Sequence, residues 1–173
     1  KKEIPRTRAN FYIMQLALAD LGVGFALPLN LLSSASPFLS FNTRYCLFET
    51  LIGVLNCFSS TFCILALSVD RLQSLHKALL YDSEMTPKRY VSIILAVWFF
   101  PLVLVGILPW FWHNELEDTP FKTCFTLYIL NKDFVAYVLL PLMYGVFISV
   151  VALYIPIMSI AFRHLRTIQA QDV

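Results

Sequence analysis

The chain has 173 residues, of which 58% are apolar and only 14% are charged, and its formal net charge is +2. Soluble domains contain about 45–50% apolar and about 25% charged residues. The composition therefore argues against a soluble enzyme, a disordered protein and a nucleic-acid binder. The four cysteines are irregularly spaced, which indicates neither a disulfide-dense scaffold nor a zinc finger.

The apolar residues gather in four segments that are long enough to cross a bilayer, which takes roughly 20 residues. The segments lie at about residues 10–32, 45–77, 88–112 and 133–168. Their apolar centres carry two charges, Asp20 in the first segment and Glu49 near the start of the second. Buried core helices of this length in a soluble protein would leave no polar face, so the sequence predicts an all-α membrane protein with four transmembrane helices. Prolines within the segments predict kinks at Pro28, Pro101, Pro109, Pro141 and Pro156.

The basic residues between the segments predict the orientation in the membrane. If residue 1 is on the cytoplasmic side, ten of the 13 Lys and Arg residues lie in cytoplasmic segments, and only Arg44, Lys122 and Lys132 lie outside. Cytoplasmic loops carry such an excess, so we expect a cytoplasmic residue 1. The chain starts without Met and ends abruptly after a basic extension, which indicates an excerpt of a larger membrane protein.

Polar side chains deep in the first two segments are the first candidate site. Asp20 lies near the expected centre of the bilayer, where a charged side chain costs about 2.5–3.5 kcal/mol on insertion scales. Asn56 and Ser60 are four residues apart and share one helical face. These three side chains suit a partial cage for a monovalent cation, and equally a hydrogen-bond cluster that joins two helices.

The ends of the second segment carry two further features. Cys46 opens the segment on the expected outer side and Cys124 lies in an outer loop, so a disulfide between them can form and persist. Asp70 and Arg71 lie at the expected cytoplasmic end. They can form an ion pair there or serve only as an interface anchor. The histidines are far apart, and no nucleophile–base pair or phosphate loop is present, so we do not expect an enzyme.

The order of these motifs resembles the second to fifth helices of a rhodopsin-like G-protein-coupled receptor. The residues that carry the resemblance are Ala19-Asp20, Cys46, Asp70-Arg71, Trp98 and Cys124. Cys46 stands 25 residues before Arg71, which is the family's spacing. The resemblance implies a fragment of a seven-transmembrane-helix bundle in the plasma membrane. It also implies a small extracellular ligand and a heterotrimeric G protein as partners.

The resemblance assigns roles to particular residues. Asp20, Asn56 and Ser60 are similar to the family's allosteric sodium site, whose remaining ligands would lie on a seventh helix; no other cofactor is implied. Cys46 and Cys124 would form the family's disulfide. The implied ligand-binding residues are Val54, Cys57, Phe125 and Thr126.

The same resemblance assigns the cytoplasmic switch. Asp70 would pair with Arg71 in the resting state, and Tyr81, eleven residues after Asp70, would donate a hydrogen bond to Asp70. Activation would free Arg71 for the G protein, while Leu79 would enter an apolar pocket on that partner. Leu72 replaces the tyrosine that the family carries after its arginine.

Within the family, the sequence is most similar to the adenosine receptor branch, for example at Val23-Gly24 and Ala26-Leu27-Pro28. Three departures bear on the ligand. Thr126-Leu127 stand where adenosine receptors carry a Phe-Glu pair, Gly53 stands where amine receptors carry an aspartate, and Val146 replaces a proline that lipid receptors also lack. We therefore expect adenosine first and a lipid or other apolar ligand second. Alternatives of another class are a truncated, non-signalling receptor and a four-span adaptor or channel subunit.

Overall fold

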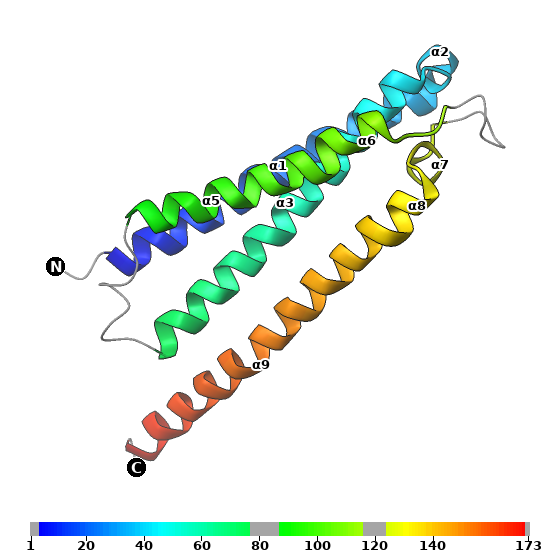
Figure 1. Ribbon diagram of the computed structural model, residues 1–173. Coiled ribbons are helices and arrows are strands. Elements are labelled where there is room, and N and C mark those ends of the chain that lie inside the picture. The colour runs from blue at the N-terminus through cyan, green and yellow to red at the C-terminus, as the bar shows by residue number, and fades with distance from the viewer. Residues whose placement is uncertain (1–3, 77–86, 116–123, 172–173) are drawn as a thin grey trace.

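The computed structural model describes residues 4–76, 87–115 and 124–171. Long helical segments run alongside one another over these residues (Figure 1). The first two are α1 (Ile4–Ala35) and α3 (Thr43–His76), and the short α2 (Pro37–Ser40) lies between them in the chain. The third consists of α5 (Pro87–Pro101), a π-helical stretch η1 (Leu102–Ile107) and α6 (Leu108–Phe111).

The fourth long segment is also composite. It follows the short α7 (Thr126–Ile129) and consists of α8 (Lys132–Phe134), the π-helical stretch η3 (Val135–Leu139) and α9 (Leu140–Gln171). Figure 1 shows α9 running alongside α3 and continuing past the C-terminal end of α3. Among the described residues, the β-structure consists of one isolated bridge between His113 and Leu130.

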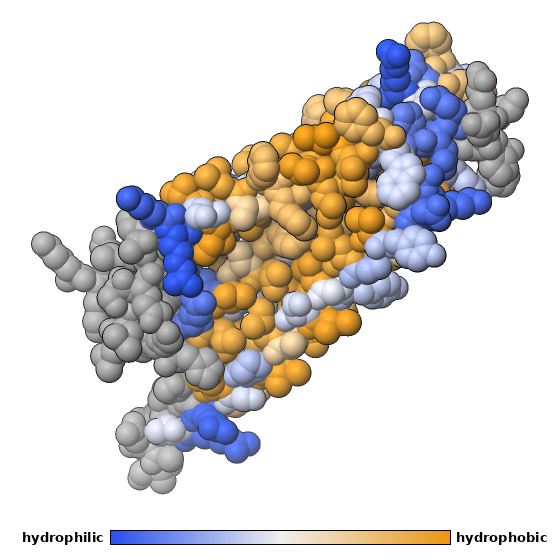
Figure 2. Space-filling model, in the orientation of Figure 1, coloured by the Kyte–Doolittle hydropathy of each residue, from blue (hydrophilic) through white to orange (hydrophobic). Residues whose placement is uncertain are grey.

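Four stretches of the described helices are long and apolar enough to cross a membrane, which confirms the predicted fold class. They are Asn10–Ala35, Thr43–Leu75, Lys88–Phe111 and Lys132–Arg163. Between 6% and 22% of each apolar window is buried inside the protein. On the face that Figure 2 shows, the exposed side chains form a broad apolar band with hydrophilic side chains toward both ends. Helices that leave most of their apolar side chains exposed suit a lipid surrounding.

A proline follows each π-helical stretch, with one residue between the stretch and the proline. η1 ends two residues before Pro109, and η3 ends two residues before Pro141. A proline ring clashes with the carbonyl four residues earlier. That carbonyl belongs to Val105 in one case and to Tyr137 in the other, and both lie inside the widened turns. The wider π turn accommodates the ring without ending the helix.

The buried apolar side chains form two clusters along α3. One lies at its N-terminal end and joins Cys46, Leu47 and Leu51 to Ile129 and Leu130 of the α7 region. The other joins Phe58 of α3 to Val105 of η1 and Phe134 of α8. Because α3 contributes to both clusters, it is the central helix against which the other segments pack.

Helices α1 and α5 are joined by a hydrogen bond inside the apolar region. The Trp98 indole Nε1–H donates to Gln15 Oε1 at 2.9 Å. Nearer the N-terminus of α5, the ring of Tyr90 meets Phe11 and Tyr12 edge-on, with centroids 5.2 and 5.4 Å away. Trp98, one of the residues on which the family resemblance rests, therefore helps to hold α5 against α1.

Helices α1 and α3 approach each other closely at Gly22. A Cβ atom added at Gly22 would overlap the side chain of Asn56, whereas one added at Gly24 meets nothing within 4 Å. Small residues allow membrane helices to come this close. The Asn56 side chain is held there because its Nδ2 donates to the Ile52 carbonyl at 2.9 Å.

We expect Gly22→Ala to destabilise the full-length protein by about 1–3 kcal/mol, because Asn56 must move or the helices must separate. Thermal unfolding of the purified protein measures the effect. The matched control is Gly24→Ala, which should be neutral or slightly stabilising. Removing the obstacle with Asn56→Ala should abolish the Gly22→Ala penalty. Equal stability of the two glycine variants would contradict the close packing.

Candidate functional site

The polar residues of α1 and α3 form one continuous seam between the two helices. Ser60 Oγ donates to Asp20 Oδ1 at 2.8 Å. One to two turns further along, Asn56 meets Gly22, and Gly53 lies near Ala26, whose Cβ is 3.7 Å from the place of a Gly53 Cβ. At the far end, Glu49 meets Asn30 and Ser33. We call these contacts the α1–α3 seam.

The inner part of the seam contains the predicted cation ligands. Asp20 and Ser60 are in direct contact, while Asn56 lies one turn away and directs its amide nitrogen to its own helix. Carboxylate and hydroxyl oxygens suit a hard cation, and they also suit the hydrogen-bonded cluster that the sequence left open. We propose the sodium role for Asp20 and Ser60, with Asn56 beside them.

A bound cation at Asp20 would favour the inactive state and so weaken agonist binding, since a ligand shifts a two-state equilibrium toward the state it prefers. We expect Asp20→Asn in the full-length receptor to remove the sodium dependence of agonist affinity, and Ser60→Ala to reduce it. Thr61→Ala is the control, because the Thr61 hydroxyl donates to the Cys57 carbonyl at 2.8 Å. If agonist affinity in Asp20→Asn still depended on sodium as in the wild type, the sodium role would be wrong. The contact between Asp20 and Ser60 would then be a structural hydrogen bond that joins α1 and α3.

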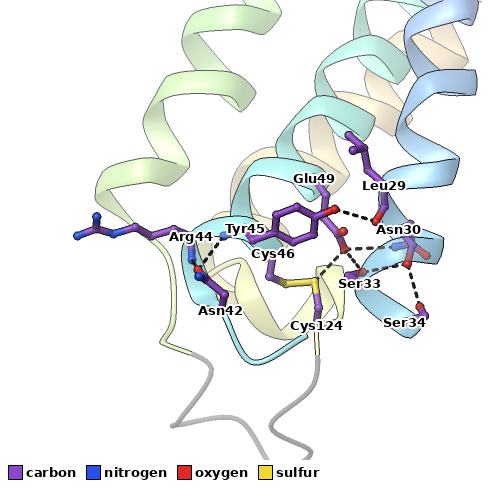
Figure 3. Close-up of a disulfide and its surroundings, with 10 residues drawn as sticks. All are labelled: Leu29, Asn30, Ser33, Ser34, Asn42, Arg44, Tyr45, Cys46, Glu49 and Cys124. Carbon is purple, nitrogen blue, oxygen red and sulfur yellow. Dashed lines mark hydrogen bonds between the residues drawn. A yellow bond between two sulfur atoms is a disulfide. The ribbon is translucent and has the colours of Figure 1, made fainter. Parts of the chain in front are cut away.

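The outer part of the seam lies against a disulfide (Figure 3). Cys46 at the start of α3 is bonded to Cys124, with Cα atoms 5.4 Å apart, which confirms the predicted pair. Beside it, Glu49 Oε1 accepts from Ser33 Oγ at 3.0 Å and lies 3.5 Å from Asn30 Nδ2. We call this the disulfide end of the bundle. The disulfide joins the loop before α7 to α3 there.

Cys46, Glu49 and Cys124 lie close enough together to resemble a metal-binding group. Cys124 Sγ is 2.9 Å from Glu49 Oε1. Both sulfurs, however, belong to the disulfide, and a metal requires the thiolate. The contact is therefore a carboxylate packed against a disulfide.

The structure divides the four predicted ligand-binding residues between different surroundings. Val54 packs against the cluster of Phe58, Val105 and Phe134. Cys57 is exposed on α3, about 16 Å along the helix from Cys46. Phe125 and Thr126 lie at the disulfide end, and the half-exposed Phe125 ring has its centroid 5.5 Å from that of Tyr128. The ligand assignment of all four residues remains a prediction.

The opposite end of α3 carries the predicted switch. Asp70 is buried, with 5% of its surface exposed, whereas the adjacent Arg71 is exposed. Asp70 and Arg89 also line an otherwise mainly apolar hollow of about 540 Å³ between α1, α3 and α5. Leu79 and Tyr81 lie outside the described residues. Their roles, and the pairing of Asp70 with Arg71, remain predictions.

Sequence reasoning noted the charge of Glu49 but gave it no role. The side chain is 4% exposed, and its Oε2 atom is buried without a hydrogen-bond partner among the described residues. One signal was available in the sequence, because Glu49 stands four residues before Gly53 and so shares its helical face. The contacts with α1 could not be read from the sequence.

Comparison with known proteins decides the family. Residues 1–171 match the family model of the 7 transmembrane receptor (rhodopsin family). The chain belongs to the rhodopsin family of seven-transmembrane receptors. It is accordingly a multi-pass membrane protein of a receptor family without enzymatic function.

Several proteins of similar sequence are amine receptors. Trace amine-associated receptor 5 of Homo sapiens is 30% identical over 96% of the chain and 50% of its own length. The alpha-2 adrenergic receptor of Carassius auratus is 31% identical over 76% of the chain and 30% of its own length. The alpha-2B adrenergic receptor of Didelphis virginiana is 35% identical over 54% of the chain and 25% of its own length. The chain spans half or less of these three relatives, and none of the three is an adenosine receptor.

Proposed function

We propose that this chain forms the second to fifth helices of a plasma-membrane receptor that binds a small extracellular ligand and signals to a heterotrimeric G protein. The observation that carries the proposal is the disulfide-linked end of α3 in a chain of the rhodopsin family. There, a loop fixed by a disulfide, a buried carboxylate and exposed aromatic side chains meet at one end of an apolar bundle. This end faces outward in the orientation that the basic residues predict.

An amine is the ligand class that we favour over adenosine. The supporting observation is the similarity to adrenergic and trace amine receptors. The adenosine hypothesis also lacks its carboxylate, since Thr126-Leu127 stand in place of the Phe-Glu pair. A lipid or other apolar ligand is the second candidate, because Gly53 offers no counter-ion at the position where amine receptors carry an aspartate.

The experiment uses cells that express the full-length receptor. G-protein activation is measured against noradrenaline, 2-phenylethylamine, adenosine and a lysophospholipid, with untransfected cells as the control. We expect a saturable response to at least one amine. A nucleoside or lipid response with no amine response would overturn the ligand class. Surface expression without any G-protein response, combined with pairing to a full-length partner receptor, would favour the non-signalling alternative.

A further inference from the structure

We propose that the Glu49 carboxylate is the counter-ion for a protonated amine ligand, displaced by one helical turn from the position that amine receptors use. The inference rests on the proposed function, since it names the group that would recognise the ligand. It resolves the apparent conflict between the amine relatives and the absence of a carboxylate at residue 53.

The first support is the state of the carboxylate itself. Glu49 is only 4% exposed, and its two oxygens differ. Oε1 accepts from Ser33 Oγ at 3.0 Å, whereas Oε2 has no hydrogen-bond partner among the described residues. A buried carboxylate oxygen without a donor is costly, because it has lost its contacts with water. An ammonium group carries a positive charge and N–H donors, and therefore supplies what Oε2 lacks.

The second support is the place of Glu49 on α3. Gly53 faces α1 near Ala26, and Glu49 faces α1 at Asn30. Glu49 and Gly53 are four residues apart on α3, as Ala26 and Asn30 are on α1. The two contacts between the helices therefore lie on the same face of α3, about 6 Å apart along the helix axis. A glutamate also extends one methylene further than an aspartate. The carboxylate is thus displaced toward the disulfide end while staying in the α1–α3 seam.

The third support is that the nearby groups leave the charge available. Ser33 and Asn30 are neutral donors to Oε1, and the disulfide sulfurs offer no proton. Arg44, the basic residue nearest to Glu49 along α3, is exposed. The seam thus stabilises one oxygen of the carboxylate with neutral hydrogen bonds and leaves its second oxygen for a cation.

The test compares charge and length at residue 49 in the full-length receptor. Glu49→Gln keeps the length and removes the charge, so amine potency in G-protein activation should fall about a hundredfold, because the ammonium group loses its charged partner in a buried pair. Glu49→Asp keeps the charge and should lose much less. Surface expression and basal signalling are measured in parallel to show that each variant folds.

A second variant, in which the carboxylate is moved from residue 49 to residue 53, distinguishes loss of the counter-ion from general damage to the fold. Gly53→Asp restores a carboxylate at the family's position, where a Cβ has room because its nearest neighbour is 3.7 Å away. The double variant Glu49→Gln with Gly53→Asp should regain most of the amine potency. If the wild type and Glu49→Gln had equal amine potency, the counter-ion role of Glu49 would be wrong, whereas the proposed function as an amine receptor would still hold. A double variant that reaches the surface with no recovery would also overturn it. A wild-type receptor that is silent to every amine would instead show that the proposed function has failed, and this inference with it.

Discussion

Replacing Cys46 and Cys124 with Ser is expected to lower the free energy of unfolding of the full-length receptor by about 2–4 kcal/mol, because the disulfide closes a long loop. The two half-cystines are separated by 78 residues, and the bond lies against the buried cluster of Leu47, Ile129 and Leu130. Without it, the α7 region is held by its packing and by hydrogen bonds such as the one that Asn114 Nδ2 donates to the Tyr128 carbonyl at 2.9 Å. Ligand binding should weaken along with stability.

Thermal unfolding of the purified receptor and surface expression measure this effect. Cys57→Ser is the matched control, since Cys57 is a free, exposed thiol whose loss should change stability little. Non-reducing mass spectrometry should find the Cys46–Cys124 peptide in the wild type. A double serine variant that unfolds at the wild-type temperature would contradict the stabilising role of the disulfide.

The second large effect is expected at the end of α3 that carries Asp70 and Arg71, which the basic residues predict to be cytoplasmic. Arg71→Ala should abolish most agonist-stimulated G-protein activation while leaving agonist binding measurable, because an exposed guanidinium is removed from the proposed contact with the partner. Asp70→Asn should raise basal signalling, since a buried charged partner is lost and the resting state is destabilised. Nucleotide exchange on the G protein, measured with and without agonist, separates the two effects.

Arg89→Ala is a useful control for the second experiment, because Arg89 is a basic residue at the same end of the bundle, on α5. It should have a smaller effect on stimulated signalling than Arg71→Ala. Wild-type basal and stimulated signalling from both α3 variants would show that Asp70 and Arg71 are only an interface anchor.

Hydropathy was sufficient to predict the four membrane-crossing helices, because a spanning helix must be apolar over its whole length. Because apolar side chains lie on exposed and buried faces of these helices alike, however, hydropathy did not indicate which residues pack against a neighbouring helix. Residues such as Leu21 and Phe111, which are 72% and 84% exposed, have the same character as buried ones. No apolar stripe therefore marks the face that meets a neighbour. The pairing of Trp98 with Gln15 and the close approach at Gly22 emerged only from the structure.

The parts of the candidate site that could be predicted are those with residue types that are uncommon in membrane helices. Asp20 and Ser60 were chosen because polar groups deep in a membrane need partners, and the structure brings them into contact. The disulfide was predicted because two cysteines share the outer side. Glu49 was missed because a charge near a helix end is ordinary, and only the structure shows that its second oxygen has no hydrogen-bond partner among the described residues.

The widened turns before Pro109 and Pro141 could not be foreseen either. A proline in a membrane helix predicts a distortion, but the sequence does not say whether the helix bends, breaks or widens. The adenosine hypothesis failed to find support for a related reason. Short motifs such as Ala26-Leu27-Pro28 describe helix packing, which many receptors share, whereas the ligand is selected by a few side chains in the cavity.

The most direct test of the proposed ligand site is the reactivity of Cys57 in the full-length receptor. Cys57 lies one turn from Gly53 and is exposed, whereas Cys63 is 2% exposed and serves as the internal control. A water-soluble thiol reagent is applied from outside, with or without the activating amine. We expect Cys57 to react, and the amine at about ten times its Kd to slow the reaction about tenfold, in proportion to the occupied fraction. An unreactive Cys57, or a rate that the amine leaves unchanged, would contradict a ligand site along this face of α3.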